Sequence, residues 1–261
     1  MAISRTNKQR KKAAAGFFKR LFTAMVIVAV IVTAFRLYDF ITTNDRFAVD
    51  EVVFAGVERL DESELRRLVH DLEGQNIVLV PIDSYRERVE NHPRVRFVHM
   101  KRVLPSRIVC TVTEREPVAL VYASEFLEVD REGIIMPEDD LTSALDLPII
   151  SGIGREEMRE GQPCRNDGLE GALRALEYCK THGDGFARDI SEIRLGKTGM
   201  SIVSLKDQSI ILVSELDVER HLKKYFLMRD TITENNDSLK LIDLRFDDQI
   251  VLRSRLRPEE R

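Results

Sequence analysis

Histidine, cysteine and carboxylate side chains are the groups with which this chain could catalyse a reaction or bind a metal ion. The five histidines are His70, His92, His99, His182 and His221, and none lies three or four residues from another histidine. Zinc-binding histidine pairs on one helix commonly have that spacing. The sequence also has no GxSxG, P-loop or GxGxxG motif. We therefore expect no catalytic residue, metal site, cofactor or small-molecule substrate, although a triad assembled from distant residues stays open.

A cluster of charged residues marks one expected helix near residue 216. Its potential ligands are Glu215, Asp217, Glu219 and His221, and its cations are Arg220, Lys223 and Lys224. Charges of both signs interleaved in this way are typical of a solvated helix face. We therefore expect a charged surface here, rather than a metal site.

The three cysteines, Cys110, Cys164 and Cys179, have no CxxC spacing and cannot form a closed disulfide framework. Cys110 lies in an alternating apolar run and Cys179 continues an apolar helical stripe, so both are expected to be small core residues. A bridge between Cys164 and Cys179 is the alternative that an oxidising compartment would permit.

Charge is distributed unequally along the chain. Residues 1–41 contain eight Lys or Arg and one acidic residue, whereas residues 42–261 contain 32 Lys or Arg and 43 acidic residues. A basic head on an acidic body indicates that the two parts face different surroundings. The acidic body would repel phosphates, which argues against nucleic-acid binding.

An uncharged apolar segment runs from Leu21 to Phe35 and predicts a membrane span at 21–41. Fifteen helical residues cover only about 22 Å, so the helix is expected to continue through Arg36, Tyr38 and Phe40 as interfacial residues. A cleaved signal peptide is the main alternative, but no convincing small-x-small cleavage site follows. Seven cations precede the span, which places the N-terminus in the cytoplasm. The basic head, residues 1–20, is expected chiefly to orient the span, with anionic lipid or nucleic acid as other possible contacts.

Two folded domains are expected after the span, and their elements follow from hydrophobic periodicity. In the first, Asp61 and Glu64 form a capping-box pattern, and Pro93 ends the second helix. Its elements are a strand at 47–54, helices from 61 and 83, and strands at 95–102 and 107–113. In the second, Asp167 and Glu170 form another capping-box pattern. Its elements are strands at 118–122, 126–130, 190–195, 200–205, 210–213, 241–246 and 250–253, with helices from 167 and at 216–233.

A set of spaced motif residues extends over about seventy residues of the first domain: Phe47, Val49, Val53, Val57, Gly74, Asn76, Ile77, Glu90, Pro93, Val95, Arg102, Pro105, Glu114, Arg115, Pro117, Val118 and Ala119. Together they resemble the POTRA domain of the FtsQ/DivIB family of bacterial cell-division proteins. In the second, Leu147-Pro148 with Gly152, and Leu241 to Phe246, resemble two further family elements. Val213-Ser214 departs from the family's usual Leu-Gly, and the short C-terminal end puts tail-dependent contacts in doubt.

The resemblance implies an α+β fold: a single N-terminal transmembrane helix, a β-α-α-β-β POTRA domain, and a mixed α/β domain with a largely antiparallel sheet. The expected boundaries are a cytoplasmic tail at 1–20, the span at 21–41, POTRA at 46–116, an FtsQ-type β domain at 117–256 and a short end at 257–261. The resemblance also implies a single-pass type II protein of the inner membrane, with its bulk in the periplasm and enriched at the division septum.

The resemblance further implies a scaffold that binds the bitopic partners FtsB and FtsL. The carried-over patch on the second domain comprises Arg245, Phe246, Asp248, Ile250 and Leu252. Strand alternation predicts that about half of its apolar members fill the core instead. A second surface, at Met100 and Arg102, would contact FtsK; a core methionine and a solvated arginine are the open alternatives there.

Two other functions are alternatives to a division scaffold. A POTRA-bearing export or outer-membrane assembly component usually carries several POTRA units or a β-barrel, and the sequence predicts one unit and no barrel. A signal-anchored periplasmic enzyme would need a catalytic motif, and none is found.

Overall fold

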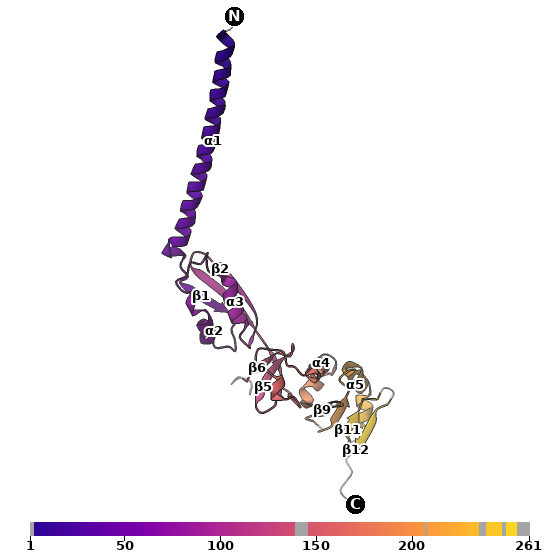
Figure 1. Cartoon of the computed structure of the whole chain (residues 1–261). Helices are drawn as coiled ribbons and strands as arrows, with labels where there is room; N and C mark the ends of the chain where they lie inside the picture. Colours follow the sequence, from indigo (N-terminus) through magenta and orange to yellow (C-terminus); the bar gives the residue numbers. More distant parts are fainter. Residues whose placement is uncertain (1–2, 139–145, 207, 235–238, 247–248, 255–261) are drawn as a thin grey trace, which may run out of the picture. The chain divides into compact units, whose positions relative to one another are not determined.

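A computed structural model describes residues 3–138, 146–206, 208–234, 239–246 and 249–254. Contacts divide the chain into two compact units, each made of several segments. The first contains residues 1–55, 62–87 and 99–111, and the second contains residues 56–61, 88–98 and 112–261. The fold is α+β, as expected (Figure 1). The domain boundary expected between residues 116 and 117 stays a prediction.

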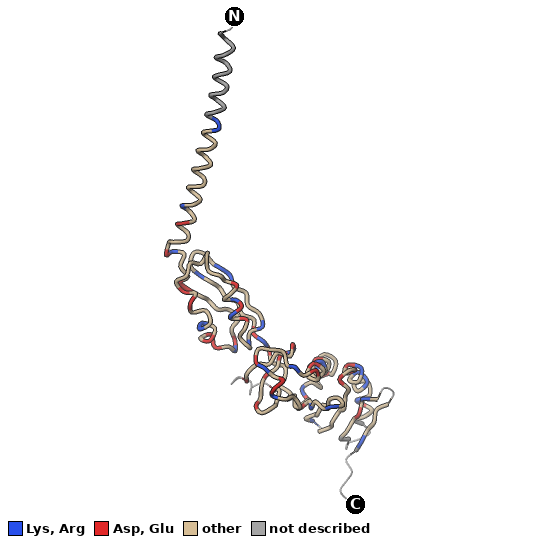
Figure 2. The backbone as a smooth tube through the Cα atoms, viewed as in Figure 1, with Lys and Arg blue, Asp and Glu red and all other residues tan. Residues whose placement is uncertain are grey.

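Helix α1 spans Ile3–Thr43 and contains one segment, Lys19–Thr43, that is long and apolar enough to cross a membrane. The most apolar 18-residue window of this segment has a mean hydropathy of 2.2, and none of that window is buried against the protein. Its 25 residues would extend about 37 Å, which exceeds the roughly 30 Å hydrocarbon core of a bilayer. Figure 2 shows the uncharged stretch between the cations of α1. The helix therefore continues beyond Phe35, as the sequence predicted.

The β-α-α-β-β order of the first domain is confirmed. Its elements are β1 (Glu51–Ala55), α2 (Glu62–Val69), α3 (Ile82–Glu90), β2 (Val95–Val103) and β3 (Arg107–Glu114). The sheet order is β1-β3-β2, and β1 pairs in parallel with β3. The first strand begins later than expected because Asp45–Phe47 forms a short 3-10 helix capped by the Asn44 side chain. Two further 3-10 turns, His70–Leu72 and Arg155–Glu157, lie outside this sheet.

The second unit contains a nine-stranded sheet in the order β12-β11-β10-β9-β8-β7-β4-β5-β6. The strands are β4 (Pro117–Tyr122), β5 (Phe126–Asp130), β6 (Ile135–Pro137), β7 (Ile149–Ser151), β8 (Ile190–Gly196), β9 (Gly199–Ser204), β10 (Ile210–Val213), β11 (Leu239–Asp243) and β12 (Val251–Ser254). Pairing is parallel for β10–β11, β7–β8 and β4–β7 and antiparallel for the other neighbours. The sheet is thus mixed but mostly antiparallel, as expected.

Two helices complete the core of the second unit: α4 (Asp167–His182) and α5 (Val218–Glu234), with a 3-10 turn at Phe186–Asp189. Every second residue of β9 is buried, at Met200, Ile202 and Ser204, as expected for a sheet covered on one face. Of the five residues predicted for the apolar stripe of α4, Leu169, Ala172, Leu176 and Cys179 are buried, and Leu173 is partly buried against the core. The capping residue was predicted wrongly: Asn166, not Asp167, caps the helix, and its side chain accepts a hydrogen bond from the Gly168 N–H.

A buried ion cluster also lies within the second unit. Glu128 of β5 is fully buried and contacts the guanidinium groups of Arg94 at 3.0 Å and Arg59 at 3.4 Å. Removing one partner from such a cluster would leave an uncompensated buried charge. The carboxylate and the two cations therefore fix the local arrangement of these segments.

Candidate partner-binding edge

Strand β12 forms one end of the nine-stranded sheet. It pairs antiparallel with β11, with Val251 opposite Asp243 and Leu252 opposite Ile242. In the part of the chain that the structure describes, no strand pairs with its outer side. Figure 1 shows β11 and β12 together near the C-terminus. The outer side of Val251–Ser254, called the β12 edge below, has the form needed for strand addition.

The opposite end of the sheet is covered by the chain itself. Ile135 of β6 and the preceding Ile134 form isolated bridges with the segment after Met158, Ile135 with Glu160 and Ile134 with Pro163. Backbone hydrogen bonds join Ile135 N–H to Gln162 O at 3.1 Å and Gly161 N–H to Ile135 O at 2.8 Å. A covered edge cannot accept another strand, so the two ends of the sheet differ in the way a one-sided docking site requires.

Leu252 lies where the buried face of the sheet meets solvent. Residues paired across antiparallel strands point to the same face, so Leu252 shares the face of Ile242, which is buried. Leu252 itself is 39% exposed, because no further strand covers it in the described residues. Ile250 lies partly buried against the core. A strand added beside β12 would extend the core over Leu252.

Phe246 lies in the segment that follows β11 and is 44% exposed. The Lys224 ammonium group, on α5, donates hydrogen bonds to the backbone oxygens of Phe246 at 2.7 Å and Gln249 at 3.1 Å. This one side chain thus binds the backbone at two points of the segment between β11 and β12. It therefore restrains the backbone at Phe246 and at Gln249.

Arg245 is engaged by its neighbour on β11. Its guanidinium donates to both carboxylate oxygens of Asp243, at 2.9 and 2.8 Å, and reaches the Thr198 hydroxyl at 3.4 Å. These hydrogen bonds lower the pKa of Asp243, to which the charge of Arg253 adds, and they raise the pKa of Arg245. A bidentate pair holds its geometry firmly. Arg245 is thus part of a formed ion pair beside the β12 edge.

The structure brings together four of the five residues expected for this patch: Arg245, Phe246, Ile250 and Leu252. Asp248 lies outside the described residues. Phe246 and Leu252 offer exposed apolar surface, whereas Ile250 packs inward. Whether these residues bind a partner stays a prediction.

Two features of α5 differ from the sequence reading. His221, expected on a solvated face, is buried at 3% exposure, because the helix turns this side toward the sheet. Lys224 was also assigned to that face, and its role in holding the Phe246–Gln249 turn was missed. The sequence around Lys224 does not indicate this contact, because the two acceptor oxygens belong to residues more than twenty positions away in the chain.

The second expected surface, at Met100 and Arg102, lies on β2, an end strand of the first sheet. Met100 is half-buried. The Arg102 guanidinium donates to the backbone oxygens of Ile77 at 2.8 Å and Val80 at 2.7 Å. Arg102 thus supports the connector between α2 and α3, and a recruitment role at this surface stays a prediction.

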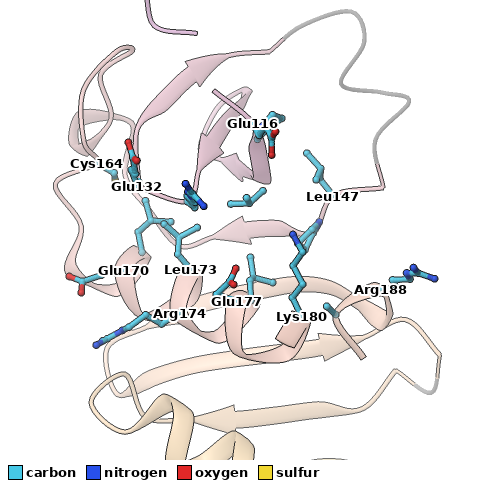
Figure 3. Close-up of a pocket in the computed structure, with 18 of the residues that line it drawn as sticks. Glu116, Glu132, Leu147, Cys164, Glu170, Leu173, Arg174, Glu177, Lys180 and Arg188 are labelled. Carbon is cyan, nitrogen blue, oxygen red and sulfur yellow. The ribbon is translucent and has the colours of Figure 1, made fainter. Parts of the chain in front are cut away.

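A pocket of about 1240 Å³ lies elsewhere in the second unit (Figure 3). Glu170, Leu173, Glu177 and Lys180 line it from α4, opposite Glu116 and Leu147. Burial raises the pKa of Cys164, which is the opposite of what a nucleophilic thiolate needs. Arg96 and Arg115 lower the pKa of Glu132, which disfavours its use as a general acid. Neither Cys164 nor Glu132 is therefore suited to act as a reactive group in this pocket.

The described residues contain neither a disulfide nor a cluster of metal-ligating side chains. All three cysteines are free thiols, so the Cys164–Cys179 bridge is not formed. Cys110 and Cys179 are buried as predicted, and burial raises the pKa of each to about 12. Across the described residues, no group of three or more His, Cys, Asp or Glu side chains could hold a metal ion.

This chain is similar to known cell division proteins. Residues 47–115 match the model of the POTRA domain, FtsQ-type. The chain is 29% identical over 209 residues to the cell division protein FtsQ of Myxococcus fulvus, covering 80% of this chain and 73% of that protein. It is 22% identical to FtsQ of Geotalea daltonii over 88% of this chain and 84% of that protein. It is 25% identical to FtsQ of Koribacter versatilis over 78% of this chain and 59% of that protein. Residues 47–115 thus match a POTRA domain of the FtsQ type, and most of the chain is similar to cell division proteins named FtsQ.

Proposed function

We propose that this chain is a divisome scaffold that captures the bitopic proteins FtsB and FtsL on the β12 edge. The observation that carries the proposal is the asymmetry of the nine-stranded sheet. One end is covered by residues 160–163, whereas the outer side of β12 has no paired strand among the described residues. Strand addition supplies backbone hydrogen bonds, and exposed side chains beside the edge supply specificity.

The exposed apolar residues at this edge suit a partner strand or helix that carries both apolar and polar side chains. Leu252 continues the buried face of the sheet, and Phe246 is exposed in the segment between β11 and β12, where Lys224 binds its backbone oxygen. Aromatic anchors held in place lose little conformational entropy on binding. Arg245 adds a charge whose carboxylate partner already fixes its position. Asp248 and Ile250 belong to the same proposed patch.

The proposed topology has a cytoplasmic N-terminus, one span within 21–41, and a periplasmic body anchored in the inner membrane. Seven cations precede the apolar segment, whereas only Arg36 and Arg46 lie within five residues of the end of the span or inside it, which is the charge bias of a type II orientation. Partners anchored in the same membrane meet at a raised effective concentration. A small strand interface is then sufficient for capture.

Two further parts of the proposal concern chemistry and recruitment. We propose that the chain acts by binding and catalyses no reaction, in keeping with the pKa directions of Cys164 and Glu132. Met100 and Arg102 on β2 are proposed as a contact for FtsK, where Arg102 would act by shaping the connector it binds.

Replacing Phe246 with Glu tests the edge directly. We expect at least a tenfold loss of FtsB–FtsL capture by the full-length chain, because a carboxylate would have to be desolvated in the interface. Leu205→Glu is the matched control: Leu205 is 58% exposed and lies at the end of β9, three positions from β12 in the sheet. Capture is measured by co-purification, and folding by thermal unfolding. Equal capture by both variants would contradict the proposed edge.

A further inference from the structure

The connector between α2 and α3 is fastened to the C-terminal end of α1. The Asn76 side-chain amide donates to the backbone oxygens of Ile41 at 2.7 Å and Thr42 at 3.1 Å. The Ile77 N–H donates to Phe47 O at 2.8 Å, and the rings of Phe40 and Phe47 meet edge to face at 6.2 Å. The segment that begins at Asn76 therefore lies against the last turn of the proposed membrane span.

Four apolar side chains are exposed at this end of the first unit: Val78, Leu79, Val103 and Leu104, which together are called the apolar rim. Leu79 is 56% exposed and Leu104 is 62% exposed. The two halves of the rim are joined by Arg102, which precedes Val103 in the chain and binds the backbone on either side of Val78 and Leu79. The rim is therefore one surface, next to the end of α1.

In the connector between α2 and α3, most backbone N–H and C=O groups around Val78 and Leu79 form hydrogen bonds within the protein. The N–H groups of Val78, Leu79 and Val80 donate to the Asn76 side-chain oxygen at 2.9 Å and to its backbone oxygen at 3.1 and 2.9 Å. Arg102 binds the oxygens of Ile77 and Val80. Backbone that enters a lipid environment must have its polar groups paired within the protein. The connector meets that requirement over most of its length.

We propose that the apolar rim inserts into the interfacial layer of the bilayer where α1 emerges. This inference rests on the proposed membrane span. The aromatic side chains of Tyr38 and Phe40 are exposed in the last turns of α1, where interfacial anchors are expected. The rim continues this apolar surface onto the first domain. Lipid contact through the rim would restrict rotation and tilt of the first domain about the end of the span.

Tryptophan fluorescence provides the test, because the chain contains no Trp. Single variants Leu79→Trp and Leu104→Trp of the full-length chain are reconstituted in phosphatidylethanolamine–phosphatidylglycerol vesicles, with or without brominated acyl chains. Phe97→Trp is the matched control: Phe97 is also 56% exposed and lies about 20 Å from Val103 along β2. Val28→Trp, within the apolar segment, reports on the span itself.

The proposal predicts blue-shifted emission and strong bromine quenching for the Leu79 and Leu104 variants, and water-like, unquenched emission for the Phe97 variant. The vesicles contain no other protein, so quenching of the rim cannot come from a partner. If Val28→Trp is quenched and both rim variants are not, the rim inference is overturned while the span stands. If Val28→Trp itself is unquenched in folded, vesicle-bound protein, the span and the rim inference both fail.

Discussion

At the scale of single residues, Lys224 and Arg245 prepare the proposed binding edge. Lys224 reaches from α5 to the backbone oxygens of Phe246 and Gln249, and Arg245 pairs with Asp243. Hydrogen bonds from a charged donor contribute more than neutral ones, although solvent exposure reduces their worth. Both contacts form within the chain itself, so they hold the backbone around Phe246 in place without a partner.

Replacing Lys224 with Met removes the donor and keeps most of the side-chain stem. We expect faster hydrogen exchange at residues 249–252 and weaker FtsB–FtsL capture, with a loss of only about 1 kcal/mol in the free energy of unfolding. Lys223→Met is the control, because Lys223 is an exposed neighbour on the same helix. If exchange in the turn is the same in both variants, Lys224 does not restrain it.

The sequence identified part of this site and missed the rest for a physical reason. The motif ending at Phe246 and the apolar run at Ile250 indicated the right strands, since alternation is a local property. The contact of Lys224 with Phe246, and the burial of Glu128 against Arg94, join residues far apart in the chain. Such pairs depend on the tertiary arrangement, which hydrophobic periodicity does not specify.

At the scale of elements, Gly152 permits the close passage of β7 beside β8. Its backbone has a φ of +94°, and a Cβ there would overlap the backbone oxygen of Leu195. Glycine alone adopts this conformation without strain and without a side chain to clash. The Leu-Pro-x-x-x-Gly motif noted in the sequence therefore ends on a residue that the pairing of β7 with β8 requires.

We expect Gly152→Ala to lower the free energy of unfolding by about 3 kcal/mol or more, because it adds a backbone clash to conformational strain. Gly185→Ala separates the two effects: Gly185 has a φ of +87° with open space around it. That control should cost only about 1–2 kcal/mol. Denaturant unfolding of the full chain in detergent gives both values, and equal losses would show that the clash is relieved.

Element types were more predictable than their arrangement. Alternation in Met200–Ser204 and the helical stripe from Leu169 to Cys179 are visible in the sequence because one face of each element is buried. The strand order was not visible. It places β7 between β4 and β8 and leaves β12 at the end, through parallel pairings between distant segments.

At the scale of the whole molecule, one apolar helix long enough to span a bilayer belongs to the first of two compact units. The proposed function needs both features. The span would confine the chain and its partners to one surface, and the second unit would supply a single open strand. With the other end of the nine-stranded sheet covered by residues 160–163, β12 is the open end of that sheet among the described residues. A scaffold built in this way would add partners without polymerising through its own sheet.

The most direct test is hydrogen exchange of the full-length chain in lipid nanodiscs, with and without bound FtsB–FtsL. Binding is predicted to slow exchange of backbone amides in Val251–Ser254 at least tenfold, because the outer N–H groups of β12 would gain partners. Exchange in β6, at the covered end of the sheet, should not change. Stable binding of FtsB–FtsL with unaltered exchange throughout β12 would contradict the proposed strand addition.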